Sequence, residues 1–244
     1  MRPRITLAVT LRVLLQLRRD HRTLAMLLVI PCLIMTLLWW MFQDRPAIGF
    51  GSLAPALLAL IPFIVMFLVT SVTTLRERTS GTLERLLAMP MGKVDFLLGD
   101  ALAFGLVAAV QSALAVLLSI WALGLDVAGP VWILLLVAVV DAVLGSALGL
   151  FVSAFARTEF QAVQFMPTVV IPQILLCGLF VARDDLPPVL EVLSDVLPLS
   201  YAVDAMTAVS RDAHPAVWGD LGVVVACVLG ALVLGALTLR RQSD

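Results

Sequence analysis

The sequence predicts an all-α membrane protein with six transmembrane helices. Five long stretches contain no Asp, Glu, Lys or Arg, and a sixth contains Asp141 alone; they are 23–43, 46–75, 101–125, 160–182, 221–239 and, with Asp141, 127–156. About 20 apolar residues in a helix cross the hydrocarbon core of a bilayer. Backbone amides in lipid must be satisfied within their own segment, so these stretches are expected to be helices. A mean hydropathy of +1.08 excludes an ordinary soluble domain.

In chain order, one transmembrane domain over 1–244 is expected to begin with an amphipathic interfacial helix at 1–22. The spans follow at 24–43, 52–75, 101–124, 131–155, 160–182 and 216–239. The first segment combines many Leu and Val residues with arginines, so its apolar side can lie in the membrane surface while the arginines reach lipid phosphates. The alternative is a basic tail without that role.

The basic residues gather on one side of the predicted membrane. Of 16 Lys and Arg residues, all except Arg45, Arg183 and Arg211 fall in the N-terminal tail, after the second or fourth span, or at the C-terminus. Loops rich in Lys and Arg stay in the cytoplasm. We therefore expect a multi-pass protein of the plasma membrane with both termini cytoplasmic.

The longest cytoplasmic segment between spans, 76–100, has the pattern of a short helix. Thr79 or Ser80 can cap it, Glu84 stands close to capping-box spacing, and Pro90 follows its last turn. A short helix placed directly after a span acts as a lever, because a protein that docks on it can move the second span.

A pair of glycines in the fourth span predicts a close helix contact. Gly145 and Gly149 are four residues apart and are flanked by small residues. This spacing lets two helix backbones approach. We favour a partner helix within the chain; a second chain is the alternative.

The external segment 183–215 is apolar as well as polar. Pro187 and Pro188 suit a helix start, and Pro198 should end that helix. About ten residues cannot cross the membrane, so we expect an external short helical hairpin between the fifth and sixth spans that dips into the outer leaflet or lies upon it.

Two motifs carry a resemblance to a known family. The run Glu77-Arg-Thr-Ser-Gly-Thr-Leu-Glu84, followed by Leu86-Leu-Ala-Met-Pro90, resembles the cytoplasmic signature of ABC-2 type permeases. The external run Cys177-Gly-Leu-Phe180, with Leu186-Pro-Pro188 and Leu197-Pro-Leu-Ser-Tyr-Ala-Val-Asp-Ala205, is similar to that of daunorubicin-resistance-type permeases. The family often has Arg shortly afterwards, where this chain has Met206, so no role is transferred there.

The resemblance implies the permease subunit of an ATP-binding cassette exporter. Such a subunit moves an amphiphilic drug or lipid-like substrate across the plasma membrane by alternating access. It pairs with a second permease chain, identical or homologous, and with two copies of an ABC ATP-binding subunit, which bind ATP and Mg. The resemblance also implies a cytoplasmic coupling helix between the second and third spans, with the ATPase-coupling residues Glu77, Gly81, Thr82, Leu83 and Glu84. The alternative is that these residues only cap and end a short helix.

The chain itself is expected to bind no cofactor and to catalyse no reaction. The pattern Gly-x-x-x-x-Gly-Lys-Ser/Thr is absent, since Gly92-Lys93 is followed by Val94. His21 and His214 fall on opposite sides of the membrane, which leaves no histidine-based metal site. Membrane lipids are expected partners, and nucleic acid is not.

Asp141 is the ionisable residue deep within a span. Its insertion costs about 3 kcal/mol, so its carboxyl should face protein or water. One interpretation is a substrate path lined by Asp141, Gln111, Gln164 and Gln173. The other is that these side chains hold helices together by hydrogen bonds.

Other functions stay open at this point. A polysaccharide or glycolipid exporter permease would favour aromatic residues along the path, and this chain has one Tyr and five Trp. A proton-coupled transporter would use Asp141. An intramembrane enzyme would need a paired nucleophile and base, which a lone Asp141 does not provide. A membrane scaffold would tolerate Glu84→Lys.

Overall fold

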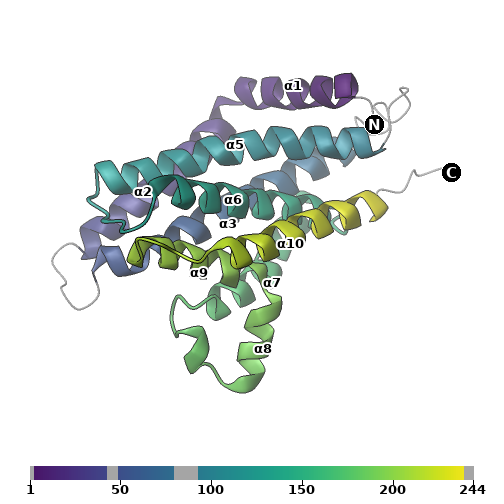
Figure 1. Cartoon of the computed structure of the whole chain (residues 1–244). Coiled ribbons are helices and arrows are strands. Elements are labelled where there is room, and N and C mark those ends of the chain that lie inside the picture. The colour runs from purple at the N-terminus through teal and green to yellow at the C-terminus, as the bar shows by residue number, and fades with distance from the viewer. Residues whose placement is uncertain (1–2, 43–48, 80–92, 239–244) are drawn as a thin grey trace.

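The computed structural model describes residues 3–42, 49–79 and 93–238. In these ranges the regular elements are all helical, as predicted (Figure 1). In chain order they are α1 (Pro3–Arg19), α2 (His21–Phe42), α3 (Phe50–Thr79), α5 (Lys93–Trp121), α6 (Val131–Ser153), α7 (Glu159–Leu176), the 3₁₀ turn η1 (Arg183–Asp185), α8 (Pro188–Val196), α9 (Pro198–Arg211) and α10 (Trp218–Thr238).

Five of the described helices are long and apolar enough to cross a membrane: α2, α3, α5, α6 and α10. The helices α8 and α9 together pass the same test as one span, but they meet at an angle of 90°. The described ranges therefore contain five such helices, or six if the bent pair counts as one. Helix α7 lies in the region predicted as the fifth span, 160–182, but ends at Leu176 and is not among the five.

Helices α3 and α6 form the centre of the bundle, and Gly145 and Gly149 explain how closely they approach. A Cβ atom built on Gly145 would lie 2.4 Å from the carbonyl oxygen of Phe63, and one on Gly149 would lie 2.5 Å from that of Phe67. Both distances are far below an ordinary contact, so only glycine fits at these positions. The predicted partner within the chain is confirmed, and it is α3.

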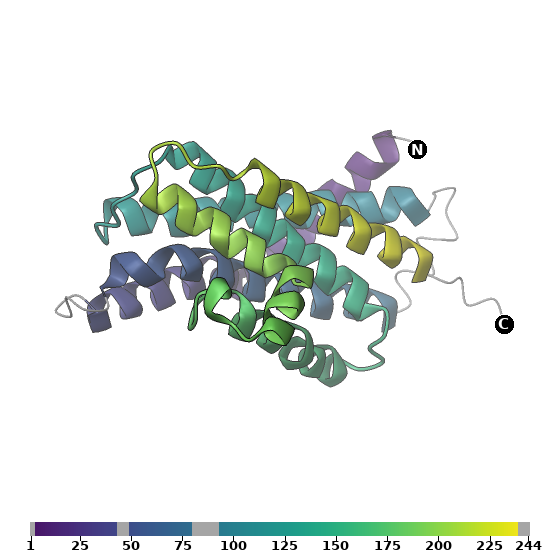
Figure 2. The same ribbon diagram turned by 60° about the horizontal axis from the view of Figure 1, so that its bottom comes forward.

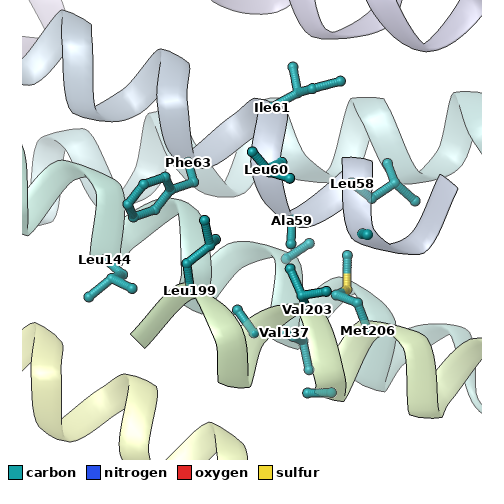
Figure 3. Close-up of a cluster of buried hydrophobic side chains, with 14 of the residues drawn as sticks. Leu58, Ala59, Leu60, Ile61, Phe63, Val137, Leu144, Leu199, Val203 and Met206 are labelled. Atoms are coloured by element: carbon teal, nitrogen blue, oxygen red, sulfur yellow. The ribbon is translucent and has the colours of Figure 1, made fainter. Parts of the chain in front are cut away.

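Helix α9 completes the core, which the sequence pattern did not predict. Its residues Leu199, Val203 and Met206 are at most 3% exposed. Figure 3 shows Leu199 beside Phe63 of α3 and Leu144 of α6, and it shows Val203 and Met206 beside Ala59 and Leu58 of α3. The predicted external hairpin corresponds to α8 and α9. Only α8 exposes a row of apolar side chains, whereas α9 inserts a stripe of apolar residues at helical spacing between α3, α6 and α10.

The turn between α7 and α9 is fixed by one arginine. Arg183 of η1 pairs with Asp195 of α8 and with Asp204 of α9. Its guanidinium also lies 4.9 Å from the ring centroid of Tyr201. Because Arg183 contacts both arms of the bent pair, it holds their 90° arrangement together.

The two ends of the bundle differ in their side chains. Exposed tryptophans stand where α2 and α5 end and where α6 and α10 begin: Trp40, Trp121, Trp132 and Trp218. Aromatic rings at this level are typical of a membrane–water interface. The opposite end holds α1, the end of α3, the start of α5 and the last turn of α10, as Figures 1 and 2 show. Glu77, the first residue of the motif predicted to be cytoplasmic, lies at this end.

Candidate functional site

Helix α1 is anchored to the bundle along α5. Its buried residues, Val9 and Val13 among them, recur at helical spacing. A Cβ atom at Gly99 would lie 2.6 Å from the side chain of Val9, and Thr10 donates a hydrogen bond of 3.0 Å to the carbonyl of Gly99. The opposite row, which includes Leu7 and Leu11, is exposed. Helix α1 thus has one face against protein and a second apolar face available to lipid.

The last turns of α3 bear two adjacent charges that pair in opposite directions. Glu77 accepts a hydrogen bond of 2.9 Å from Arg12 of α1. Its neighbour Arg76 donates two hydrogen bonds, of 2.8 and 3.0 Å, to the two carboxylate oxygens of Glu159 in α7. The end of α3 is therefore joined both to the helix that begins the chain and to the helix that precedes the bent pair.

The two ion pairs differ in their environment. The side chains of Arg12 and Glu77 are 24% and 12% exposed, whereas those of Arg76 and Glu159 are 61% and 50% exposed. Water screens the second pair, so its contribution is about 0–1 kcal/mol. The first pair is largely withdrawn from water, and removing one partner would leave the other charge without compensation.

Glu159 begins α7, where a carboxylate is stabilised. The hydrogen bonds from Arg76 lower the pKa of Glu159. Thr158 caps the same helix by accepting a hydrogen bond from the amide of Gln161. A negative charge in a first helical turn also interacts favourably with the helix dipole. Arg76 therefore meets an ionised partner at neutral pH.

An open cleft of about 530 Å³ lies beside this junction. Side chains from α1, α3 and α7 line it, including Gln16, Thr73, Arg76, Glu77 and Glu159. The cleft separates α1 and α7 on the side of α3 where the cytoplasmic motif begins. Charged side chains join the helices at this point, and beside them Leu75 of α3 packs in an apolar cluster with Ala162 of α7.

The predicted ATPase-coupling residues fall largely outside the described residues. Glu77 is described and lies within the junction. Gly81, Thr82, Leu83 and Glu84 lie outside, as does most of the helix expected after Thr79. The described part of the motif therefore consists of the end of α3 and its two ion pairs.

The four residues of the predicted substrate path do not share one environment. Asp141 and Gln111 are at most 1% exposed, and none of their side-chain polar atoms has a hydrogen-bond partner among the described residues. Gln173 is 2% exposed and donates a hydrogen bond to the carbonyl of Val169. Gln164 alone is exposed, on the outer face of α7.

Sequence reasoning missed the partners in the junction. Arg12 and Glu77 are 65 residues apart in the chain, and Arg76 and Glu159 are 83 apart. Local patterns carry no signal for pairs at such separations. The signal that was available is the position of Glu77 at the end of a span, where a charge is either solvated or paired.

Comparison with known proteins decides the family. The model of the family described as "ABC-2 type transporter" matches residues 5–210. The chain belongs to the ABC-2 type transporter family. This match covers α1 to α9 and confirms the resemblance seen in the cytoplasmic and external motifs. The chain is accordingly a multi-pass membrane protein of the ABC-2 permease type.

Curated relatives of this ABC-2 chain include proteins from bacteria and a eukaryote. It is 26% identical over 194 residues to ABC transporter G family member 20 of Dictyostelium discoideum, covering 78% of this chain and 27% of that protein. It is 29% identical over 150 residues to the probable multidrug ABC transporter permease YbhR of Escherichia coli K12, covering 62% and 41%. The inner membrane transport permease YhhJ of the same organism is 26% identical over 155 residues, covering 62% and 41%. The chain spans less than half the length of these relatives.

Proposed function

We propose that this chain is the permease subunit of an ATP-driven exporter that moves an amphiphilic drug or lipid-like substrate across the plasma membrane. Its partners are two copies of a separate ATP-binding subunit, which supply ATP and Mg, and a second permease chain, identical or homologous. The observation that carries this proposal is the junction at the end of α3, directly before the cytoplasmic motif. The printed names of the bacterial relatives, a probable multidrug ABC transporter permease among them, support the substrate class.

The coupling step follows from the connections of α3. An ATP-binding subunit that grips the segment with Gly81, Thr82, Leu83 and Glu84 would pull on α3. Through Glu77 that pull would reach α1, and through Arg76 it would reach α7. Since α3 also packs along α6, a tilt of α3 would move the centre of the bundle. Such a movement is what alternating access between the two sides of the membrane requires.

The second permease chain would cover α7. The outer face of α7 presents Gln161, Gln164 and Thr168 together with apolar side chains. Exposed polar side chains at membrane depth are costly in lipid but suit a contact with another helix or a water-filled path. The exposed faces of α2 and α10 are apolar and suit lipid. We therefore place the substrate path along α7, with Gln164 facing it.

The proposal gives no direct substrate contact in this conformation to Asp141, Gln111 and Gln173. They are buried within one chain in this conformation, so they would reach a substrate only after the helices separate. Gly145 and Gly149 hold α6 tightly against α3 a turn or two further along. In this arrangement Asp141 acts inside the bundle, as a neutral carboxyl, more readily than as a proton carrier for transport.

Transport by inverted membrane vesicles tests the proposal. Vesicles from the native host are compared with vesicles from a strain that lacks the chain, with ethidium and an NBD-labelled phospholipid as probes. We expect ATP-dependent uptake of one of these probes that needs the chain, survives an uncoupler and is retained in Asp141→Asn. Uptake that is insensitive to ATP, abolished by the uncoupler and lost in Asp141→Asn would replace the proposal with proton-coupled transport.

A further inference from the structure

Asp100 is a buried carboxyl that the coupling proposal does not use. It lies about two turns into α5 and is 1% exposed. Neither of its carboxyl oxygens has a hydrogen-bond partner among the described residues. A carboxylate buried without a partner is strongly disfavoured, because nothing replaces the water that it loses. Asp100 must therefore be neutral or acquire a cation.

The charges that act on Asp100 come from two of the helices packed against α5. They are those of Glu77 at the end of α3 and Arg12 of α1. On α5 itself, Asp95 is also buried and lies five residues earlier. The other charged groups with described side chains on the helices packed against α5 are not among the charges that act on Asp100. They are Arg4, Arg18 and Arg19 of α1, His21 and Arg22 of α2, Arg76 of α3, Asp141 of α6 and Asp220 of α10.

Arg12 has a free donor on its buried side. One terminal nitrogen, Nη2, donates to Glu77, while its Nε–H is buried and finds no acceptor among the described residues. A guanidinium has five N–H donors in a fixed fork and suits two acceptors. Among the described residues Arg12 donates a hydrogen bond to the carboxyl of Glu77, while its charge also acts on the buried carboxyl of Asp100.

We propose that Asp100 is a proton site and the alternative partner of Arg12. In this conformation Arg12 pairs with ionised Glu77, and Asp100 holds a proton. In the alternative arrangement Arg12 pairs with ionised Asp100, and the proton moves to Glu77. One proton and one hydrogen-bond partner change places, so the net charge of the three groups stays the same in both arrangements.

The exchange would depend on the position of α3 relative to α5. Glu77 belongs to α3 and Asp100 to α5, and these helices flank residues 80–92 on either side. If α3 moves relative to α5, Arg12 of α1 either keeps Glu77 as its partner or changes to Asp100. Its significance for transport rests on the proposed function. The exchange itself needs no ATPase, so a test on the isolated chain fails or succeeds independently of that function.

A double-mutant cycle on the purified full chain in mild detergent tests the proposal. The melting temperature is measured for Asp100→Asn, Glu77→Gln and the double variant at neutral pH. Asn copies a neutral carboxyl and needs no proton on folding, so Asp100→Asn alone should raise the melting temperature or leave it unchanged. In the Glu77→Gln background the same change removes the remaining carboxylate partner of Arg12 and should lower the melting temperature by more than about 5 °C.

Asp141→Asn is the matched control, because Asp141 is also fully buried and has no hydrogen-bond partner within the described ranges, but lies on α6. Its effect should be the same with and without Glu77→Gln. Equal effects of Asp100→Asn in the two backgrounds would overturn the proposal. If Glu77→Gln does not fold, Arg12→Gln takes its place, and there Asp100→Asn should raise the melting temperature or leave it unchanged; a loss would contradict the assignment.

The pH dependence gives a second readout. Asp100 is ionised in the unfolded chain at neutral pH and protonated in the folded chain, so the folded chain binds one more proton. The free energy of unfolding should therefore fall as the pH rises, because the proton that folding binds becomes scarcer. Asp100→Asn should remove this part of the fall. An unchanged fall in Asp100→Asn would mean that Asp100 does not hold the proton.

Discussion

Replacing Gly149 with Val is expected to lower the melting temperature of the chain by about 5–10 °C. A Cβ atom at this position would already lie 2.5 Å from the carbonyl oxygen of Phe67. The obstacle is backbone rather than the end of a flexible side chain, so α3 and α6 must move apart to admit even one methyl group. The same reasoning applies to Gly145, which faces the carbonyl of Phe63 at 2.4 Å.

The matched control is Gly230→Val in α10. Nothing lies within 4 Å of a Cβ atom built on Gly230. Both substitutions add the same side chain to an apolar helix, so their difference isolates the contact between α3 and α6. Thermal unfolding of the two purified variants is the measurement. Equal melting temperatures for Gly149→Val and Gly230→Val would show that these helices are not in close contact.

Arg12→Glu is expected to reduce ATP-dependent transport by about tenfold, with the chain still inserted in the membrane. The substitution places a second carboxylate where Glu77 now accepts a hydrogen bond of 2.9 Å. Two like charges in a position largely withdrawn from water repel, so α1 should separate from the end of α3. The pull on α3 would then no longer reach α1.

The reversed pair, Arg12→Glu with Glu77→Arg, distinguishes the loss of the ion pair from a general loss of structure. If the ion pair transmits the movement, the double variant should regain a substantial part of the transport that either single variant loses. Arg18→Glu, at an exposed position of the same helix, is the control and should transport normally. Failure of the double variant to exceed both single variants would contradict a role for the pair itself.

The helical fold was predictable from the sequence because lipid imposes a simple rule. Long uncharged stretches must be helices in a bilayer, and the five helices that pass the test for a span fall in five of the six predicted regions. Helix α9 was not predictable in the same way. Pro198 was expected to end a helix, but it also begins one, and apolar residues such as Leu199 and Val203 suit a core as well as a membrane surface.

Sequence reasoning identified only one member of the junction at the end of α3. Glu77 belongs to a motif with local spacing, so a family resemblance could single it out. Arg12 and Glu159 belong to no such motif, and they reach α3 because α1 and α7 fold back against it. The predicted substrate-path residues also differ in burial in a way that local sequence patterns do not show. Asp141 and Gln164 both lie in apolar stretches, yet tertiary packing encloses the first and leaves the second exposed.

The most direct measurement for the proposed function is the set of proteins that accompany the tagged chain out of its native membrane. The chain is purified in mild detergent, and the preparation is analysed by mass spectrometry, with Glu84→Lys as the comparison variant. We predict a soluble ATPase with a phosphate-binding loop in roughly stoichiometric amount, lost from the Glu84→Lys preparation while the permease remains. A pure permease without any ATPase, or an ATPase retained in Glu84→Lys, would contradict the proposed coupling through this segment.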